Sequence, residues 1–303
     1  MRDNLEKEAN YTYKMLEEDF VICKKQFVEE SGLIPKGKEL FVFIDRENKD
    51  EKFTPYVTPL VGEKQFKMII PEDYLKAIFS FVKNDVIPYS QEFLPENVEV
   101  SRIFANSILY SSFLHEFSHF IRNHHSKLKP SKQNTTNDLK VIEIDADVIA
   151  ACLLFSFIST TGLSRGLLIK SVIVGIRGQF EIVHRYFTNH NLTSSYELEP
   201  ISRAYIALCN MATAPTFEND LELEKDISNE LQDMENKLFK NSWINATGKM
   251  EPRFDSNLWH QSKESLSEYA HSDFEQTVWT SVVNAKFRRF ISSIKRVVYN
   301  FIN

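Results

Sequence analysis

The chain has 303 residues, of which 43% are hydrophobic, and its formal net charge is −6 at pH 7. This apolar content excludes an intrinsically disordered chain, and the negative charge gives no electrostatic basis for binding nucleic acid. Only 8 glycines and 10 prolines predict few turns and a predominantly helical fold. Cys23, Cys152 and Cys209 lie far apart at no metal-binding spacing, so we expect buried free thiols in a reducing compartment.

The N-terminal part of the sequence predicts a helix followed by a small sheet. Between residues 5 and 30 the apolar positions recur every three or four residues, as on one helical face, at Leu16, Phe20, Cys23 and Phe27. Residues 39–44 and 65–70 have the composition of strands, and residues 74–81 that of a helix. We expect the second of these strands to form the sheet edge along which an extended peptide lies.

A helix predicted over residues 101–124 carries the sequence H-E-F-S-H. His115 and His119 are four residues apart, so both imidazoles lie on one face and can bind one metal ion, with Glu116 beside them. Zinc in such a site lowers the pKa of its bound water, and Glu116 is the candidate base that takes the proton as the water attacks a carbonyl. Apolar positions cover the other sides of the helix. Burying two histidines and a glutamate without a partner is costly, which favours a metal.

The next predicted helix, over residues 138–163, carries a cluster of carboxylates. Glu143 and Asp147 are four residues apart and share a face, whereas Asp145 points elsewhere. A catalytic zinc takes three protein ligands and leaves its fourth position to water. We therefore interpret Glu143 as the third ligand and Asp147 as the acceptor that orients a ligand histidine. The alternative is an acidic first turn that favours the helix dipole.

The H-E-F-S-H sequence followed by E-I-D-A-D resembles the glutamate-zincin (gluzincin) metallopeptidases. It is similar in particular to the ImmA/IrrE-type, HtpX-type and phage-exclusion Lit peptidases. The resemblance covers about residues 100–210 and implies zinc on His115, His119 and Glu143, Glu116 as general base and Asp147 in support. It implies an α+β, predominantly helical fold: a zincin-like core with a small N-terminal sheet and a C-terminal helical region. Unlike the HtpX-type enzymes, the chain is polar between the two motifs, over residues 122–140.

Many gluzincins place a group that stabilises the oxyanion after the third-ligand helix. The candidates in that part of the chain are His184, His190, Tyr196 and Arg203. Arg203 is the best single choice, because Pro200-Ile201-Ser202-Arg203 is similar to a segment of the HtpX-type enzymes. His124 and His125 follow the first motif closely, but on a continuous helix they fall on other faces. We interpret them as helix-end residues that the helix dipole favours.

The composition changes near residue 214, and we expect a peptidase domain over 1–214 and a helical accessory region over 215–303. In the accessory region an acidic helix carries the apolar stripe Ile227, Leu231, Met234 and Leu238. A C-terminal helix from about Asp273 combines basic residues with an apolar stripe, a pattern that also fits an anionic membrane surface. We expect it instead to dock onto the acidic helix.

These patterns predict an intracellular zinc metallopeptidase, and the resemblance implies that it cleaves one or a few protein targets and has a phage or mobile-element role. The alternative is a catalytically idle protein that keeps a zincin fold for binding or regulation. The first residues lack the apolar core of a secretory signal, and the longest apolar run, 148–163, is too short to span a membrane. We therefore expect a cytoplasmic protein without an integral membrane segment. Neither its substrate nor its oligomeric state follows from the sequence.

Overall fold

A computed structural model of the protein describes residues 11–47, 52–60, 64–91, 98–127, 136–190, 200–212, 220 and 222–240. These residues form a predominantly helical α+β structure with a small sheet, as predicted. The predicted domain boundary near residue 214 and the predicted C-terminal helix from Asp273 lie outside the described residues.

The elements before the H-E-x-x-H sequence are α2 (Tyr13–Lys24), the π-helix η1 (Lys25–Glu30), β1 (Glu39–Asp45), β2 (Tyr56–Pro59), β3 (Gln65–Pro71), α3 (Glu72–Phe81), the π-helix η3 (Val82–Val86) and α4 (Ile87–Gln91). They are followed by α5 (Val98–Ile121), α6 (His124–Lys127), α7 (Thr136–Ser159), α8 (Arg165–Asn189), α9 (Pro200–Ala212) and α10 (Leu223–Lys237). The predicted helices that fall within the described residues and the two predicted strands are therefore present. Strand β2 was not predicted.

The sheet has the order β1-β3-β2, so the expectation that the strand beginning at Gln65 lies at an edge is wrong. Strand β3 pairs in parallel with β1 and antiparallel with β2. Its residues are almost continuously buried, as is typical of a central strand. The edge strand nearest the helices is β2, whose Pro59 fits an edge because proline cannot donate to a neighbouring strand.

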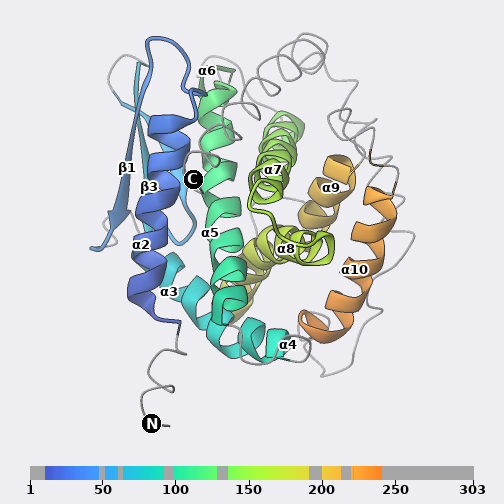
Figure 1. Cartoon of the computed structure of the whole chain (residues 1–303). Helices are drawn as coiled ribbons and strands as arrows, with labels where there is room; N and C mark the ends of the chain where they lie inside the picture. Colours follow the sequence, from blue (N-terminus) through green and yellow to red (C-terminus); the bar gives the residue numbers. More distant parts are fainter. Residues whose placement is uncertain are drawn as a thin grey trace.

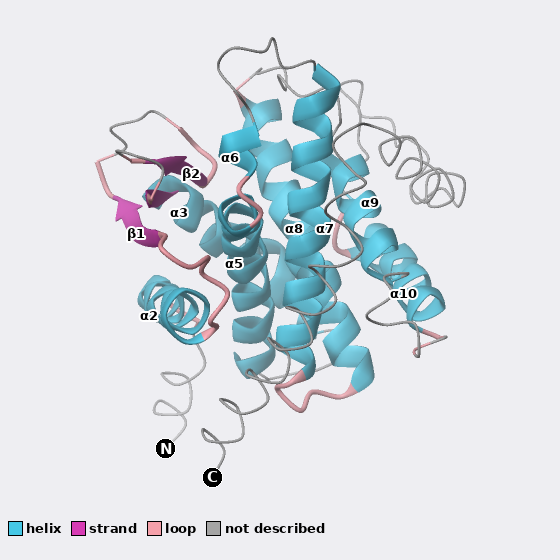
Figure 2. Ribbon diagram, turned by 90° about the horizontal axis from the view of Figure 1, so that it is seen from above, coloured by secondary structure: helices cyan, strands magenta, loops and turns pink. Residues whose placement is uncertain are grey.

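Helix α5 lies in the centre of the molecule, between the sheet on one side and α7 to α10 on the other (Figure 1). One face of the sheet packs against it, and the ring centroids of Phe66 in β3 and Phe120 in α5 are 5.0 Å apart. Phe27 of η1 contacts Phe113 and Phe117 of α5. Seen from above, α7 and α8 run beside α5, and α9 and α10 lie beyond them (Figure 2). Every residue of α5 from Ser107 to Phe120 is thus buried, including the polar ones.

Two glycines allow α8 to cross α5 at close range. A Cβ atom at Gly175 would lie 2.7 Å from the backbone oxygen of Ser107, and one at Gly178 would lie 3.1 Å from the side chain of Ile108. A larger side chain at Gly175 therefore requires the backbone to move, whereas one at Gly178 requires the side chain of Ile108 to shift by a few tenths of an ångström. The crossing brings Gln179 of α8 against Ser111 of α5.

Helix α5 ends at Ile121, before the predicted end at residue 124. Asn123 has a positive φ of 58°, the left-handed conformation in which asparagine, after glycine, often ends a helix. The chain reverses there, and His124 begins the short helix α6. The side chain of His124 is consequently not on a continuation of the α5 surface.

Helix α10 packs against α8 and α9. The predicted stripe of Ile227, Leu231, Met234 and Leu238 is buried and belongs to the same hydrophobic core as the other helices. None of the helices in the described part of the chain has the length and hydropathy that a membrane crossing requires.

Candidate metal centre

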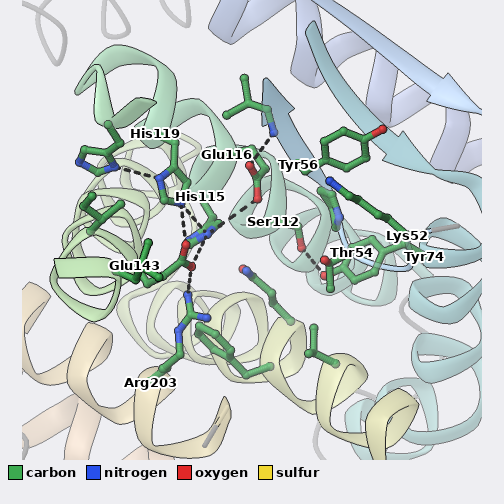
Figure 3. A pocket seen from close by; sticks show the side chains of 18 of the residues that line it. Lys52, Thr54, Tyr56, Tyr74, Ser112, His115, Glu116, His119, Glu143 and Arg203 are labelled. Atoms are coloured by element: carbon green, nitrogen blue, oxygen red, sulfur yellow. Dashed lines mark hydrogen bonds and ion pairs between the residues drawn. The ribbon is translucent and has the colours of Figure 1, made fainter. Parts of the chain in front are cut away.

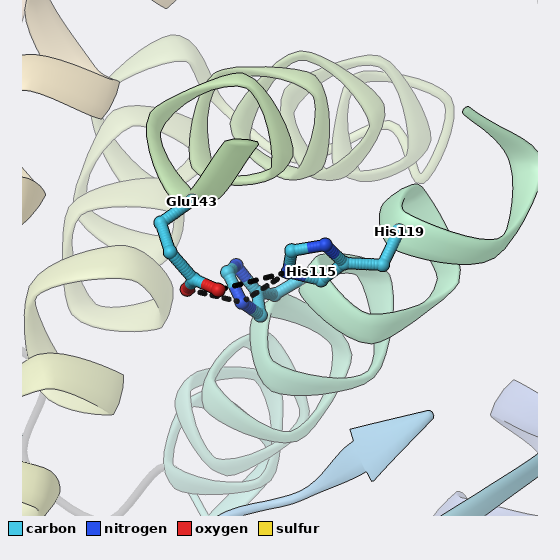
Figure 4. A group of neighbouring side chains, drawn as sticks. All are labelled: His115, His119 and Glu143. Carbon is cyan, nitrogen blue, oxygen red and sulfur yellow. Dashed lines mark hydrogen bonds and ion pairs between the residues drawn. The ribbon is translucent and has the colours of Figure 1, made fainter. Parts of the chain in front are cut away.

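The structure brings the three predicted ligands together in space. His115 and His119 project from one face of α5, and Glu143 reaches them from α7 (Figure 4). The two Nε2 atoms are 3.1 Å apart, and the carboxylate oxygens of Glu143 lie 3.4 Å from Nε2 of His115 and 3.6 Å from Nε2 of His119. Both histidines are buried, so this group lies at the bottom of a cavity rather than on the surface.

These separations fit the geometry of a tetrahedral metal site. With ligand bonds of roughly 2.0–2.1 Å, the ligand atoms of tetrahedral zinc lie roughly 3.3–3.4 Å from one another. The separation of the two nitrogens and the two shortest distances to Glu143, which involve different carboxylate oxygens, are near this value, and with one ligand atom per residue the three atoms lie within 4.8 Å of one another. Two imidazole nitrogens and a carboxylate are also a donor set that zinc accepts in hydrolases. The residues present therefore fit a metal ion of this kind.

Asp147 and Arg203 hold the side of the site that contains His115. Nδ1 of His115 lies 2.7 Å from Oδ1 of Asp147, the contact expected of an acceptor that orients a ligand histidine. Nε and Nη2 of Arg203 donate to Asp147 at 2.8 and 3.0 Å, and Nη2 also donates to Glu143 at 2.9 Å. Arg203 thus contacts two carboxylates of the centre and also lines the cavity beside them, and its role at the oxyanion stays a prediction.

A second and unexpected set of residues holds His119. Nδ1 of His119 lies 2.9 Å from Nδ1 of His124, and Nε2 of His124 lies 2.9 Å from Oδ2 of Asp145. Arg122 donates to both oxygens of Asp145, at 2.9 and 3.2 Å. The interpretation of His124 as a helix-end residue favoured by the dipole is therefore incomplete, because its ring is buried and connects two elements. Asn123 just before it was the available sequence signal for the chain reversal.

The electrostatics of the centre favour a cation between the carboxylates. Burial by itself lowers the pKa of His115, but Asp147 and Glu143 outweigh this effect and raise it to about 10. Burial lowers the pKa of His119 well below its usual range. Burial disfavours the charged form of Glu143, yet His115 and Arg203 hold its pKa well below the usual range. Glu143 is consequently a carboxylate, the form in which it can bind a metal.

Glu116 is held beside the histidines by the edge strand. Its Oε2 atom accepts a hydrogen bond of 2.9 Å from the backbone N–H of Val57 in β2, and its Oε1 atom lies 3.8 Å from Nε2 of His115. Burial raises the pKa of Glu116 to about 7. The carboxylate thus lies between the candidate ligands and the sheet, at the position that a general base would need.

A cavity of about 370 Å³ opens over these residues and extends toward the sheet (Figure 3). It is within the size range of sites that bind small molecules or parts of larger ones. Its polar wall is formed by Lys52, Thr54, Tyr56, Tyr74, Ser112 and Gln179, and its apolar wall by Leu139, Ile142, Phe180, Val183 and Phe187. The cavity therefore has room for an extended segment with an apolar side chain beside the three candidate ligands.

Gln179 places a side-chain amide in this cavity, which the sequence did not indicate. Its Oε1 atom accepts a hydrogen bond of 2.7 Å from Ser111, so the carboxamide orientation is fixed from behind. Gln179 also lines the cavity, and its amide group retains a nitrogen that can donate. Tyr74 lines the cavity as well, but Ser112 donates to the carbonyl of Ile108 and so accepts the hydroxyl proton of Tyr74. Gln179 is the better donor.

The remaining oxyanion candidates do not gather at the cavity. His184 and His190 are absent from its lining, and His190 is exposed beyond the end of α8. Tyr196 lies outside the described residues. Their position in the sequence after the third-ligand helix was a weak signal, because a long helix carries residues far from the site that it helps to form.

Comparison with known proteins adds no assignment to this geometry. No family model matches the chain, and neither a curated protein nor a solved structure matches it. The function is therefore argued from the arrangement of the side chains.

Proposed function

We propose that the protein is a zinc-dependent metallopeptidase of the glutamate-zincin type. The observation that carries the proposal is the convergence of one ligand atom each from His115, His119 and Glu143 to within 4.8 Å of one another, with Glu116 next to them. A zinc ion in such a site supplies Lewis acidity, which makes a water molecule acidic near neutral pH and polarises a carbonyl group. A zincin-like core is part of this proposal.

The protein's own residues have distinct roles in this reaction. Glu116 takes a proton from the attacking water and later delivers it to the leaving amine. Its orientation is fixed by the N–H of Val57, which leaves Oε1 toward the histidines. The amide nitrogen of Gln179 donates to the carbonyl oxygen as negative charge develops on it. Asp147 and Arg203 keep His115 and Glu143 in place.

The edge of β2 that lies opposite β3, and that pairs with no other strand among the described residues, is where we place the substrate backbone. Leu60 donates its N–H to Gln65, and Val57 donates its N–H in the opposite direction, to Glu116. Because backbone N–H and C=O groups alternate between the two sides of a strand, the backbone groups of Val57 and Pro59 face away from β3. Pro59 has no N–H, so this edge offers mainly carbonyl acceptors. An extended peptide can pair with it by donating its own amides.

The test of the proposal is the metal content and the activity of purified protein. Wild-type protein is expected to hold one zinc per chain, and His115→Ala to lose it, whereas His190→Ala, at an exposed histidine outside the cavity, keeps its metal. Glu116→Gln is expected to keep zinc and to lose cleavage by on the order of 10²–10⁴-fold. Cleavage is measured with a peptide library, by counting new amino termini.

Two results would contradict the proposal in different ways. Wild-type protein without stoichiometric zinc would remove the metal centre and everything that depends on it. Zinc-loaded wild type that cleaves no peptide, and whose Glu116→Gln variant behaves identically in every assay, would favour the catalytically idle alternative. Where wild type holds zinc and cleaves peptides, the peptides and proteins trapped on the Glu116→Gln variant identify the substrate class.

A further inference from the structure

His119 is connected to a buried carboxylate through a second histidine. His124 is only 1% exposed, and its two ring nitrogens lie 2.9 Å from Nδ1 of His119 and 2.9 Å from Oδ2 of Asp145. His115, in contrast, contacts Asp147 directly. Each carboxylate is held in turn by an arginine, Asp145 by Arg122 and Asp147 by Arg203.

The contacts of His124 determine which nitrogen of His119 carries the proton. In its neutral form the ring of His124 has one N–H. The carboxylate of Asp145 can only accept, so that N–H is at Nε2. Nδ1 of His124 is then an acceptor, and His119 must donate from its own Nδ1. The lone pair of His119 is left on Nε2, which faces His115 and Glu143.

We infer that His124 and Asp145 are positioning residues that fix the tautomer and orientation of His119 for metal binding. This inference rests on the proposed function, since it requires a metal at His115, His119 and Glu143. It assigns a role to His124 that its position in the sequence did not predict. The two ligand histidines are thereby prepared in the same way, His115 by a carboxylate in direct contact and His119 by a carboxylate acting through an imidazole.

Zinc affinity, measured by competition with a fluorescent chelator, tests the inference without any substrate. His124→Leu removes the acceptor and is expected to weaken zinc binding by about 10–100-fold. His124→Asn places an amide oxygen near the position of Nδ1 and is expected to recover part of the loss. Asp145→Asn is compared with Glu235→Gln, because both change a buried carboxylate that pairs with an arginine into an amide. Only Asp145→Asn should weaken zinc binding.

The tautomer itself is observable in metal-free protein by ¹⁵N NMR of labelled histidines. Wild type is expected to show His119 protonated at Nδ1, and His124→Leu to show a population protonated at Nε2. Unchanged zinc affinity and an unchanged His119 spectrum in His124→Leu would overturn the inference while leaving the metal centre intact. An equal loss of affinity in Glu235→Gln would overturn it too, by showing that looser packing is the cause. Wild type that binds no zinc would remove the proposed function as well.

Discussion

At the scale of single residues, the side chains of the candidate centre are held in their orientations by contacts with neighbouring residues. Ser111 fixes the amide of Gln179, Val57 fixes Glu116, and Asp147 contacts His115. Such support reduces the reorganisation that a reaction requires, because the groups already have the orientation that the transition state needs. The sequence indicated Glu116 and Asp147 through their spacing, but nothing in it marked Gln179.

Replacing Gln179 should distinguish the contribution of its hydrogen bond to the substrate carbonyl from the contribution of the metal. Gln179→Leu keeps the size of the side chain and removes the donor, so we expect peptide cleavage to fall by about 10²–10³-fold with zinc content unchanged. Ser111→Ala removes only the hydrogen bond that orients the amide, and a smaller decrease is expected. Turnover and zinc content are measured on the same preparations. Full activity in Gln179→Leu would show that another group stabilises the oxyanion.

At the scale of elements, the edge strand β2 connects the sheet to the chemistry. It was missed in the sequence because its four residues are short for a strand and end in Pro59, a residue that usually argues against one. The two sides of β2 differ. One side pairs with β3, and the other gives its Val57 N–H to Glu116.

Proline substitutions on the two sides of β2 should affect different properties of the protein, one mainly its activity and the other its stability. Val57→Pro removes the N–H that orients Glu116 but no hydrogen bond to β3, so we expect activity to fall by about 10–100-fold, and because the Val57 side chain is buried, lost packing also lowers stability. Thr58→Pro removes a donor on the side that pairs with β3 and is expected to lower the free energy of unfolding by about 1–3 kcal/mol. Urea unfolding and peptide cleavage distinguish the two variants. Unchanged cleavage by Val57→Pro would show that Glu116 does not need the strand.

At the scale of the whole molecule, a buried ionic network joins α10 to the rest of the helices. Arg177 of α8 is fully buried and donates to Glu235 of α10 at 2.7 Å and to Glu181 at 3.0 Å. Arg185 donates to Glu181 and to Asp85, which extends the network to η3. Removing one member of such a network leaves buried charge without its compensation. Tertiary packing in this region therefore depends on all of these residues together.

The stability of the protein should depend on this network far more than on surface ion pairs. Arg177→Leu removes the cation that compensates Glu181 and Glu235 and is expected to lower the free energy of unfolding by about 3–5 kcal/mol. Lys237→Met removes an exposed pair with Asp233 on α10 and is expected to cost about 0–1 kcal/mol. Urea unfolding followed by circular dichroism gives both values. A loss in Arg177→Leu as small as that expected for Lys237→Met would mean that the buried network contributes little.

The sequence by itself determined the features that lie within single elements. Helical periodicity predicted that His115 and His119 share a face, that Glu143 and Asp147 share another, and that α2 and α10 bury one apolar stripe each. The reason is that a helix fixes the relative direction of residues three and four apart, whatever surrounds it.

Only the tertiary structure decided how these elements meet. The reversal at Asn123 turns His124 back onto His119, the close crossing of α5 and α8 places Gln179 in the cavity, and sheet order makes β2 rather than β3 the edge. None of these follows from local spacing, because each depends on where the chain turns and on how closely two separate elements approach. The candidate ligands were therefore predictable from sequence, whereas the groups that hold them in place were only partly so.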